Sequence, residues 1–335
     1  MHSYRRGLCN LFFGIALLTS TRMESAQSDF VKGMTVSCQT SGWEWATPQM
    51  AHTLDELKSL GVNSVSIHPY AQIRNDGHVR FRVTDDNRQI TVPLDWARER
   101  GLSVMLIPHI AYWGTKFLWR GEINFQTNEE WDRFFGDYEI WIVQMAQLAE
   151  AHGAGTFCIG LEFTNAQKFE QHWRKIIAAV RSVYHGKVTY GGNWDSFQEV
   201  KFWDALDYIG VLAYFPLTKS VDPTAREIAA AWEKKCAELE AFSKAHGGKR
   251  FLFVEIGYNQ SARAAAEPWA FKTGGDNAVE IQRRCIEVAL DLPAHCAVIA
   301  GMYWWKWFPD LPSHEEENYR LQTPEIKTMI AKHWR

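Results

Sequence analysis

Eight short apolar runs, most of them followed by a segment of helical period, constrain the fold of this chain more than any other feature. The runs are apolar almost throughout, as strands buried on both faces of a parallel sheet should be. Several helical segments end at a glycine that suits a helix C-cap. The predicted strands cover residues 33–38, 62–68, 103–109, 156–162, 187–193, 208–214, 250–255 and 297–305. The predicted helices cover residues 49–60, 94–100, 128–152, 167–184, 224–245, 276–290 and 324–333, and a weaker helix is predicted over residues 196–206.

Alternation of this kind over 335 residues predicts an α/β fold, a single (β/α)8 TIM barrel. A doubly wound open sheet is the main alternative. It would need a glycine-rich phosphate-binding loop after an early strand, and the sequence has none. Because no linker, repeat or low-complexity segment divides the chain, we expect one domain over residues 28–335.

The first 27 residues predict a secretion signal. Arg5 and Arg6 give a positively charged start, and the apolar stretch over residues 8–18 is too short to span a bilayer. The cleavage site stays open, because no clear small-residue motif marks it. We therefore expect a secreted or periplasmic protein with no stable membrane association after processing.

Cysteine usage predicts no metal site, because no cysteine or histidine pair has the spacing of a zinc site. We interpret the acidic run at residues 314–317 as solvated charge and residues 85–87 as a turn, not as a calcium loop.

Removal of the signal would leave an odd number of cysteines, so at least one thiol stays free. One disulfide is compatible with the sequence, and its pairing is open among Cys38, Cys158, Cys236, Cys285 and Cys296.

The charge and the aromatic residues narrow the class of partner. A net charge of -3 with no Lys/Arg-rich stretch argues against a nucleic-acid partner. The chain has 16 Trp, many beside polar residues, as at Trp43 and Trp119. A pyranose has apolar C–H faces and polar edges, so aromatic planes beside polar groups favour a carbohydrate ligand. Glu44, between two of these tryptophans, could contact a distal sugar or be a surface carboxylate.

Polar or aromatic residues stand at the ends of successive predicted strands, where barrel enzymes carry their chemistry. Two strands end on a glutamate, Glu162 and Glu255. A charge at the end of a buried apolar strand is costly to bury, so it is expected where the strand end faces a binding or catalytic site. Paired carboxylates serve glycoside hydrolysis, one as acid/base and the other as nucleophile. The other strand ends carry His68, His109, Asn193, Tyr214 and Trp305.

The sequence resembles glycoside hydrolase family 113, a member of clan A of the barrel glycosidases. The resemblance rests on residues 108–109, 119–123, 157–162, 189–195, 202–210, 213–217, 254–258, 268–269 and 304–307. It implies a retaining endo-β-1,4-mannanase in which Glu162 is the acid/base and Glu255 the nucleophile. It implies no metal and no cofactor.

One position departs from the clan pattern. Clan A enzymes usually carry Asn just before the acid/base, where it holds the sugar 2-hydroxyl, and this chain has Leu161. Asn193 and His109 are the candidates to supply that contact. We expect substrate contacts from His68, His109, Asn193, Tyr214, Trp43, Trp119, Trp305 and Trp307.

The last predicted strand and Tyr214 allow two finer predictions. Trp305 should form the floor of the sugar subsite, with Trp307 further out on the same side and Trp304 against the helices. The alternative is that Trp304 faces the mouth of the barrel and Trp305 packs under the outer helices. Tyr214 should donate a hydrogen bond to Glu255 and keep the pKa of its carboxyl low.

Three function classes fit the sequence. The first is a monomeric hydrolase that cleaves β-1,4-mannan or glucomannan. The second applies the same chemistry to another β-linked polysaccharide, such as a β-glucan or xylan. The third is a non-catalytic carbohydrate-binding barrel, which would have no need for both Glu162 and Glu255.

Overall fold

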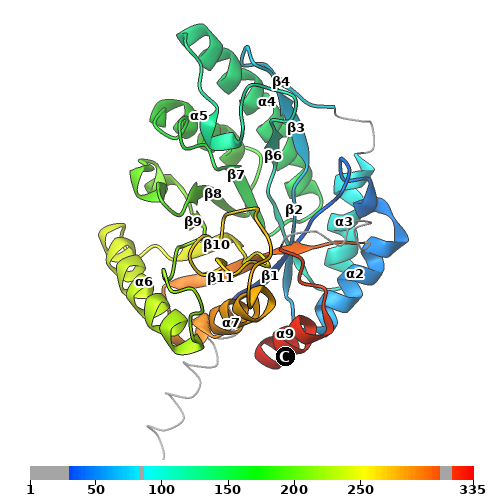
Figure 1. Cartoon of the computed structure of the whole chain (residues 1–335). Helices are drawn as coiled ribbons and strands as arrows, with labels where there is room; N and C mark the ends of the chain where they lie inside the picture. The colour runs from blue at the N-terminus through cyan, green and yellow to red at the C-terminus, as the bar shows by residue number, and fades with distance from the viewer. Residues whose placement is uncertain (1–29, 83–86, 310–318) are drawn as a thin grey trace, which may run out of the picture. The chain divides into compact units, whose positions relative to one another are not determined.

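Parallel strands close into a barrel in this computed structural model, which describes residues 30–82, 87–309 and 319–335 (Figure 1). Around the barrel the strand order is β1, β2, β5, β7, β8, β9, β10 and β11, and β11 pairs with β1 to close it. The strands are β1 (Val31–Val36), β2 (Ser64–Ile67), β5 (Ser103–Leu106), β7 (Thr156–Leu161), β8 (Lys187–Asn193), β9 (Ile209–Leu212), β10 (Phe251–Ile256) and β11 (Ile299–Trp307). The predicted (β/α)8 barrel is confirmed.

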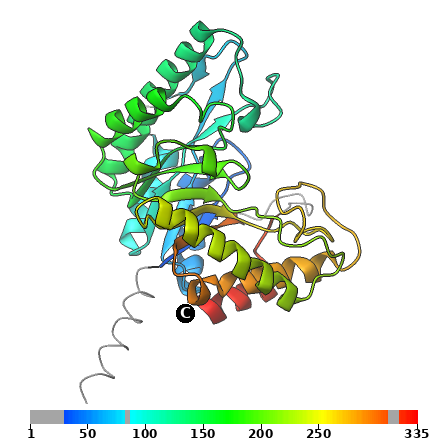
Figure 2. The ribbon, with the colours of Figure 1, turned by 90° about the vertical axis from the view of Figure 1, so that its left-hand side faces the viewer.

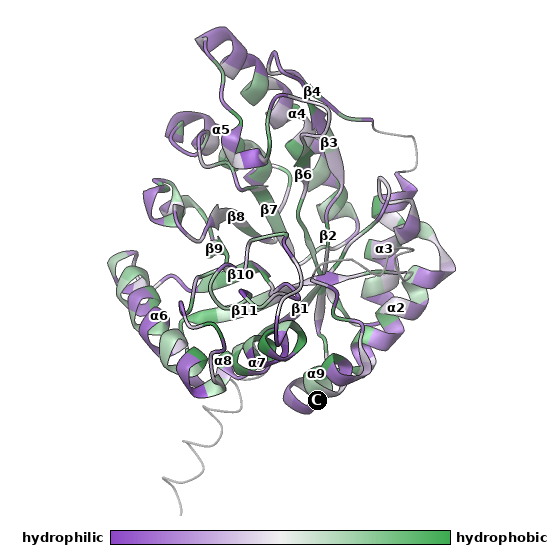
Figure 3. Cartoon of the chain, viewed as in Figure 1, coloured by the Kyte–Doolittle hydropathy of each residue, from purple (hydrophilic) through white to green (hydrophobic). Residues whose placement is uncertain are grey.

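Helices surround this barrel, as the two orthogonal views show (Figures 1 and 2). In the longer helices, such as α4 and α5, the buried residues recur at helical spacing, so one side of the helix packs on the barrel and the other is more hydrophilic (Figure 3). The helices are α2 (Pro48–Ser59), α3 (Arg88–Glu99), α4 (Asn128–Ala151), α5 (Glu170–Arg181), α6 (Ala225–Ala245), α7 (Ala278–Leu290), α8 (Leu292–His295) and α9 (Pro324–Trp334). None of these described helices is long and apolar enough to cross a membrane.

A second, smaller sheet was not predicted. Strand β3 (Tyr70–Ile73) pairs antiparallel with β4 (Val79–Arg80) and parallel with β6 (His109–Ala111). The sequence predicted one strand over residues 103–109, but the barrel strand ends at Leu106 and His109 begins β6. Pro108 lies at this break, because proline has no N–H to donate to a strand ladder.

Two helix predictions also differ from the structure. The segment predicted as a helix over residues 196–206 forms two 3-10 turns, η3 (Phe197–Glu199) and η4 (Trp203–Ala205). The buried Trp203 indole N–H donates to the Phe197 carbonyl at 3.0 Å. This side-chain hydrogen bond joins the two turns in place of the backbone hydrogen bonds of a continuous helix. Helix α3 begins at Arg88, before the predicted residue 94, and contains Pro93.

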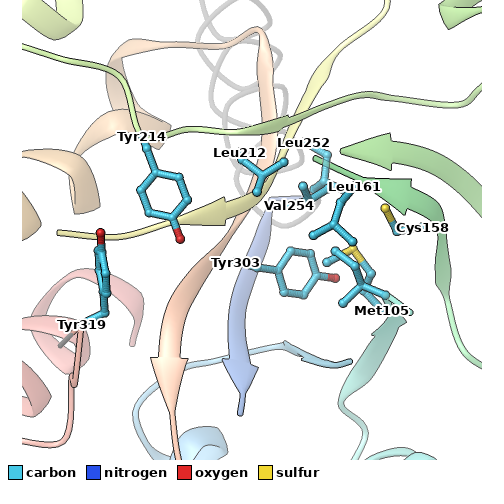
Figure 4. Close-up of a cluster of buried hydrophobic side chains, with 10 residues drawn as sticks. Met105, Cys158, Leu161, Leu212, Tyr214, Leu252, Val254, Tyr303 and Tyr319 are labelled. Atoms are coloured by element: carbon cyan, nitrogen blue, oxygen red, sulfur yellow. The ribbon is translucent and has the colours of Figure 1, made fainter. Parts of the chain in front are cut away.

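The side chains of the barrel interior form one buried cluster. Leu161, Leu212 and Val254 meet there, with Tyr214 and Tyr319 together at one end of the cluster (Figure 4). This packing fills the barrel below the strand ends, so the barrel is a core and not a pore.

The structure settles the cysteine pairing that the sequence left open. Cys236 of α6 forms a disulfide with Cys296, which follows α8. Cys158 and Cys285 are buried free thiols, as small core residues would be, and Cys38 is half-buried. The predicted secretion signal over residues 1–27, the acidic run at 314–317, and Asp85 and Asp86 of the predicted turn lie outside the described residues.

Candidate active site

Glu162 and Glu255 both stand at the carboxyl end of the barrel. Glu162 directly follows β7, and Glu255 lies next to the last residue of β10. The two carboxylates differ in exposure, with 22% of the Glu162 side chain accessible and 8% of that of Glu255. The pair therefore consists of one carboxylate open to a ligand and one almost covered.

The backbone at Glu162 turns sharply. Its φ is 60°, in the left-handed region that favours glycine and costs another residue about 1 kcal/mol. The Glu162 N–H donates to the Gly191 carbonyl at 2.9 Å, and the Thr164 N–H donates to the Glu162 carbonyl at 2.9 Å. These bonds fix the turn, so the carboxylate leaves the strand direction at a defined angle.

Arg120 joins three parts of the site and was not among the predicted site residues. Its Nη1 donates to Glu162 Oε2 at 2.5 Å, and its Nε donates to the Ile110 carbonyl at 2.8 Å. Its Nη2 donates to His109 Nδ1 at 3.1 Å. Because arginine only donates, Nδ1 of His109 accepts, and the proton of this imidazole lies on Nε2.

His109 and His68 stack on one another with their ring centroids 4.7 Å apart. Burial lowers the pKa of His68 to about 3, and the positive charges of Lys306 and Arg120 add to the effect. Burial, followed by the charge of Arg120, holds the pKa of His109 well below its ordinary value. Both rings are therefore neutral, and His109 Nε2 lies 3.8 Å from Glu255 Oε1.

Tyr214 donates a hydrogen bond to Glu255 Oε2 at 2.9 Å, as the sequence predicted. The predicted effect on the pKa is wrong, however. Burial raises the pKa of Glu255 to about 8, the negative charge of Glu162 adds to this, and the bond from Tyr214 only opposes it. Burial and the charge of Glu255 raise the pKa of Tyr214, so its hydroxyl keeps the proton that it donates.

The last strand brings Trp305, but not Trp307, to the histidines. Trp305 is half-buried and lies 5.4 Å from the His68 ring and 6.2 Å from the His109 ring. In the ladder between β1 and β11, Met34 pairs with Trp304 and Val36 with Trp307, so β11 has one extra residue. Such a bulge reverses the face of the residues after it.

Trp307 therefore shares its face with Trp304, contrary to the prediction. Both side chains are almost completely buried, and the Lys327 ammonium of α9 lies 5.4 Å from the Trp307 ring centroid. Tyr303 belongs to the cluster inside the barrel, so its neighbour Trp304 faces outward, as predicted, and Trp307 faces outward too.

The remaining predicted residues take outer or supporting positions. Asn193 Nδ2 donates to Thr164 Oγ1 at 3.0 Å, which ties the end of β8 to the turn after Glu162. His68 is completely buried and stacks on His109, and its Nε2 lies 3.2 Å from Ser37 Oγ. Trp43 is the first residue of the 3-10 turn η1 (Trp43–Ala46) and is 65% exposed, and Trp119, in the loop after β6, is 36% exposed.

The position before Glu162, where clan A enzymes usually carry asparagine, has a side chain that points into the barrel core and not toward the site. Leu161 is completely buried in the cluster inside the barrel. Glu44 is a loop-organising group, since its Oε1 accepts from the N–H groups of Gln39 and Thr40 at 2.9 Å.

A (β/α)8 barrel with glutamates at the ends of its fourth and seventh strands and aromatic rings beside them is typical of glycoside hydrolases. The family model for Glycoside Hydrolase Family 113 matches residues 34–322, and the chain belongs to this family. The chain is thus a glycoside hydrolase. No curated protein sequence matches it.

Solved structures agree with this membership. A family 113 β-mannanase from Alicyclobacillus acidocaldarius, in complex with ManMIm, is 27% identical, with a TM-score of 0.77 over 91% of this chain and 97% of that one. A complex of a family 113 β-1,4-mannanase is 25% identical, with a TM-score of 0.79 over 91% of this chain and 99% of that one. A broad-specificity endoglucanase from Clostridum cellulovorans, at 12% identity and a TM-score of 0.61, shares the fold.

Proposed function

We propose that this glycoside hydrolase is a retaining endo-β-1,4-mannanase that cleaves mannan or glucomannan by double displacement. The observation that carries the mechanism is the pair of unequal carboxylates, Glu162 held by Arg120 and Glu255 held by Tyr214. The similar solved structures that are named as β-mannanases support the substrate.

In the first step, Glu162 gives its proton to the oxygen between two sugars while Glu255 attacks the anomeric carbon. The bond from that carbon to the leaving oxygen breaks, and a bond to a Glu255 oxygen forms. Glu255 must be ionised for this attack, and the hydrogen bond from Tyr214 favours its ionised form.

In the second step, Glu162 takes a proton from water, and the water oxygen attacks the same carbon from the face that the leaving sugar vacated. The bond to Glu255 breaks and its carboxylate is restored. Two inversions give net retention, and Glu162 regains the proton that it lost in the first step.

His109 is our candidate to hold the sugar 2-hydroxyl in place of the usual asparagine. Leu161 is buried in the barrel, and the side-chain amide of Asn193 already donates to Thr164. His109 Nε2–H has no hydrogen-bond partner among the described residues and lies 3.8 Å from Glu255 Oε1. A neutral imidazole N–H beside the nucleophile can donate to a hydroxyl on the adjacent ring carbon.

Reducing-sugar assays on mannan, glucomannan, cellulose and xylan test the substrate. We expect the highest kcat/KM on the two mannose-containing polymers, with products of several lengths from the start of the reaction. The mannose 2-hydroxyl is axial where that of glucose is equatorial, so higher activity on cellulose or xylan would contradict this specificity.

Azide tests the two roles, because it is a nucleophile that needs no general base. It should rescue Glu162→Ala and give a β-glycosyl azide, since it attacks the glycosyl-enzyme. It should rescue Glu255→Ala, if at all, with the α-anomer. Exchanged anomers would mean that the two roles are reversed.

We also propose that the protein is exported. Disulfides persist in oxidising compartments, and the Cys236–Cys296 bond supports such a location. N-terminal sequencing of the protein recovered from the medium or periplasm tests this proposal, and intact protein confined to the cytosol would contradict it.

A further inference from the structure

Two tryptophans that no part of the mechanism uses form a stacked pair. The rings of Trp194 and Trp269 have centroids 4.7 Å apart and planes 21° apart. Trp194 follows the last residue of β8, and Trp269 lies in the loop after β10. Trp269 is 40% exposed and Trp194 is partly buried, so one ring of the pair supports the other at the surface.

The loop that carries Trp269 is fixed from beneath on both sides of this residue. The hydroxyl of Tyr319 donates to the carbonyls of Pro268 and Ala270. The side-chain amide of Asn259 also donates to the Ala270 carbonyl. Tyr319 is 4% exposed and Asn259 is 1% exposed, so the anchors belong to the core while the indole does not. An exposed ring held this firmly loses little conformational entropy when a ligand stacks on it.

The pair is continuous with the catalytic groups. Trp194 packs on the buried cluster that contains Tyr214, the donor to Glu255. Its neighbour Asn193 donates to Thr164, two residues after Glu162. Strand β8 pairs directly with β7, the strand that Glu162 follows, and not with β10, so Trp194 at the end of β8 lies on the Glu162 side of the site. Trp305 of β11 instead lies against His68 and His109.

We propose that Trp269, supported by Trp194, is the platform for a hexopyranose on the leaving-group side of the scissile bond. This inference rests on the proposed function, because the acid/base of a glycosidase faces the leaving sugar. A pyranose ring would place its apolar C–H face on the outer indole. The sugar stacked there would belong to the departing part of a longer β-1,4-linked chain.

The test compares substrates with and without a leaving sugar. For Trp269→Ala we expect kcat/KM on a hexasaccharide to fall about tenfold, from the loss of one stacking contact. On the β-disaccharide fluoride, whose leaving group is a fluoride ion, we expect a change of less than about twofold. Trp269→Phe should restore most of the hexasaccharide activity. An equal loss on both substrates, or no loss on the hexasaccharide, would overturn the proposal.

Phe271→Ala is the matched control. Phe271 lies two residues along the same loop and is 81% exposed, so it has the exposure of a platform, but no ring among the described residues supports it. We expect it to leave hexasaccharide cleavage unchanged. A loss equal to that of Trp269→Ala would mean that the loop as a whole matters, and not this indole.

The wild-type enzyme is first assayed on manno-, cello- and xylo-hexaose, and the series that it cleaves fastest is then used. Failure of the mannan assignment therefore leaves this test intact. If none is cleaved, calorimetry with the three hexaoses replaces the assay. About tenfold weaker binding to Trp269→Ala supports the platform, and equal affinity or no binding overturns it.

Discussion

Arg120 connects the groups of the active site at the scale of single residues. Its guanidinium contacts Glu162, His109 and the Ile110 carbonyl at once. A planar fork can make these three contacts together, whereas the ammonium of lysine cannot reproduce them. Arg120 is therefore a positioning residue for the carboxylate that we propose as the acid/base.

For Arg120→Lys we expect kcat/KM on the polymer to fall about 100-fold, the size of effect that a misplaced catalytic group can have. On a glycosyl fluoride the loss should be much smaller, because fluoride leaves without a proton. The control is Arg174→Lys on the outer face of α5, where Arg174 contacts Glu170 and Asp204. Equal losses on polymer and fluoride would show that Arg120 does not act through Glu162.

The raised pKa of Glu255 predicts how Tyr214→Phe will behave. The hydrogen bond from Tyr214 favours the ionised form, so its removal should raise the pKa of Glu255 further above the ordinary value. Only ionised Glu255 attacks, so the acidic limb of the kcat/KM profile should move to higher pH.

The pH profile of Tyr303→Phe is the control for this prediction. Tyr303 is also a buried tyrosine, but its hydroxyl lies 2.8 Å from Ser64 Oγ inside the barrel. Removal of this hydroxyl should leave the acidic limb of the kcat/KM profile at its wild-type pH. A Tyr214→Phe profile that stayed in place or moved to lower pH would contradict the argument.

For single residues, the sequence predicts which positions belong to the site better than it predicts their hydrogen-bond partners. Glu162 and Glu255 could be placed because each ends an apolar strand. Arg120 could not, because its partners lie 10, 11 and 42 residues away and only the folded loops bring them together. Its only signal was its place in the stretch over residues 119–123 that resembles the family. The pKa of Glu255 was misjudged because burial, which the sequence does not show, outweighs the bond from Tyr214.

At the scale of elements, the bulge in β11 separates two tryptophans that the sequence treats alike. Trp305→Ala should lower kcat and weaken binding, because Trp305 lies beside the histidines of the site. Trp307→Ala should instead lower the free energy of unfolding by about 4 kcal/mol, as loss of a buried aromatic side chain does.

Urea unfolding and steady-state kinetics on both variants check this separation. Trp307→Ala should keep the wild-type kcat at temperatures where it is folded. The opposite pattern, with stability lost in Trp305→Ala and turnover lost in Trp307→Ala, would contradict the assignment of Trp305 to the site and Trp307 to the outer packing of β11.

Helices with local signals were predicted well, and segments without them were not. Helices α4 and α6 begin at capping boxes, with Thr127 and Thr224 as N-caps, and their predicted ends agree to within one residue. The small sheet of β3, β4 and β6 has short strands with no clear alternation. Its pairing depends on the barrel strands before it, so the sequence alone did not show it.

At the scale of the whole molecule, the disulfide links two segments far from the catalytic end. Cys236 and Cys296 are 60 residues apart, and closing a loop of that length stabilises a protein by about 4 kcal/mol in the chain-entropy model. For Cys236→Ala we expect a lower urea midpoint with unchanged kcat, because Cys296 precedes β11 and so lies at the end of the barrel opposite to the strand ends that carry the glutamates. Cys38→Ser, at a half-buried free thiol, is the control and should leave the midpoint close to that of wild type. Equal midpoints for Cys236→Ala and wild type would contradict a stabilising bond.

The left-handed backbone at Glu162 also bears on how this chain could diverge in evolution. Glycine and asparagine adopt that conformation at the least cost, and β-branched residues at the greatest. A gene copy that drifted away from catalysis would therefore be expected to settle on Gly or Asn at position 162. Position 255 lies within a strand and has no such bias. The inactive descendants of this barrel should carry a recognisable signature at one catalytic position and none at the other.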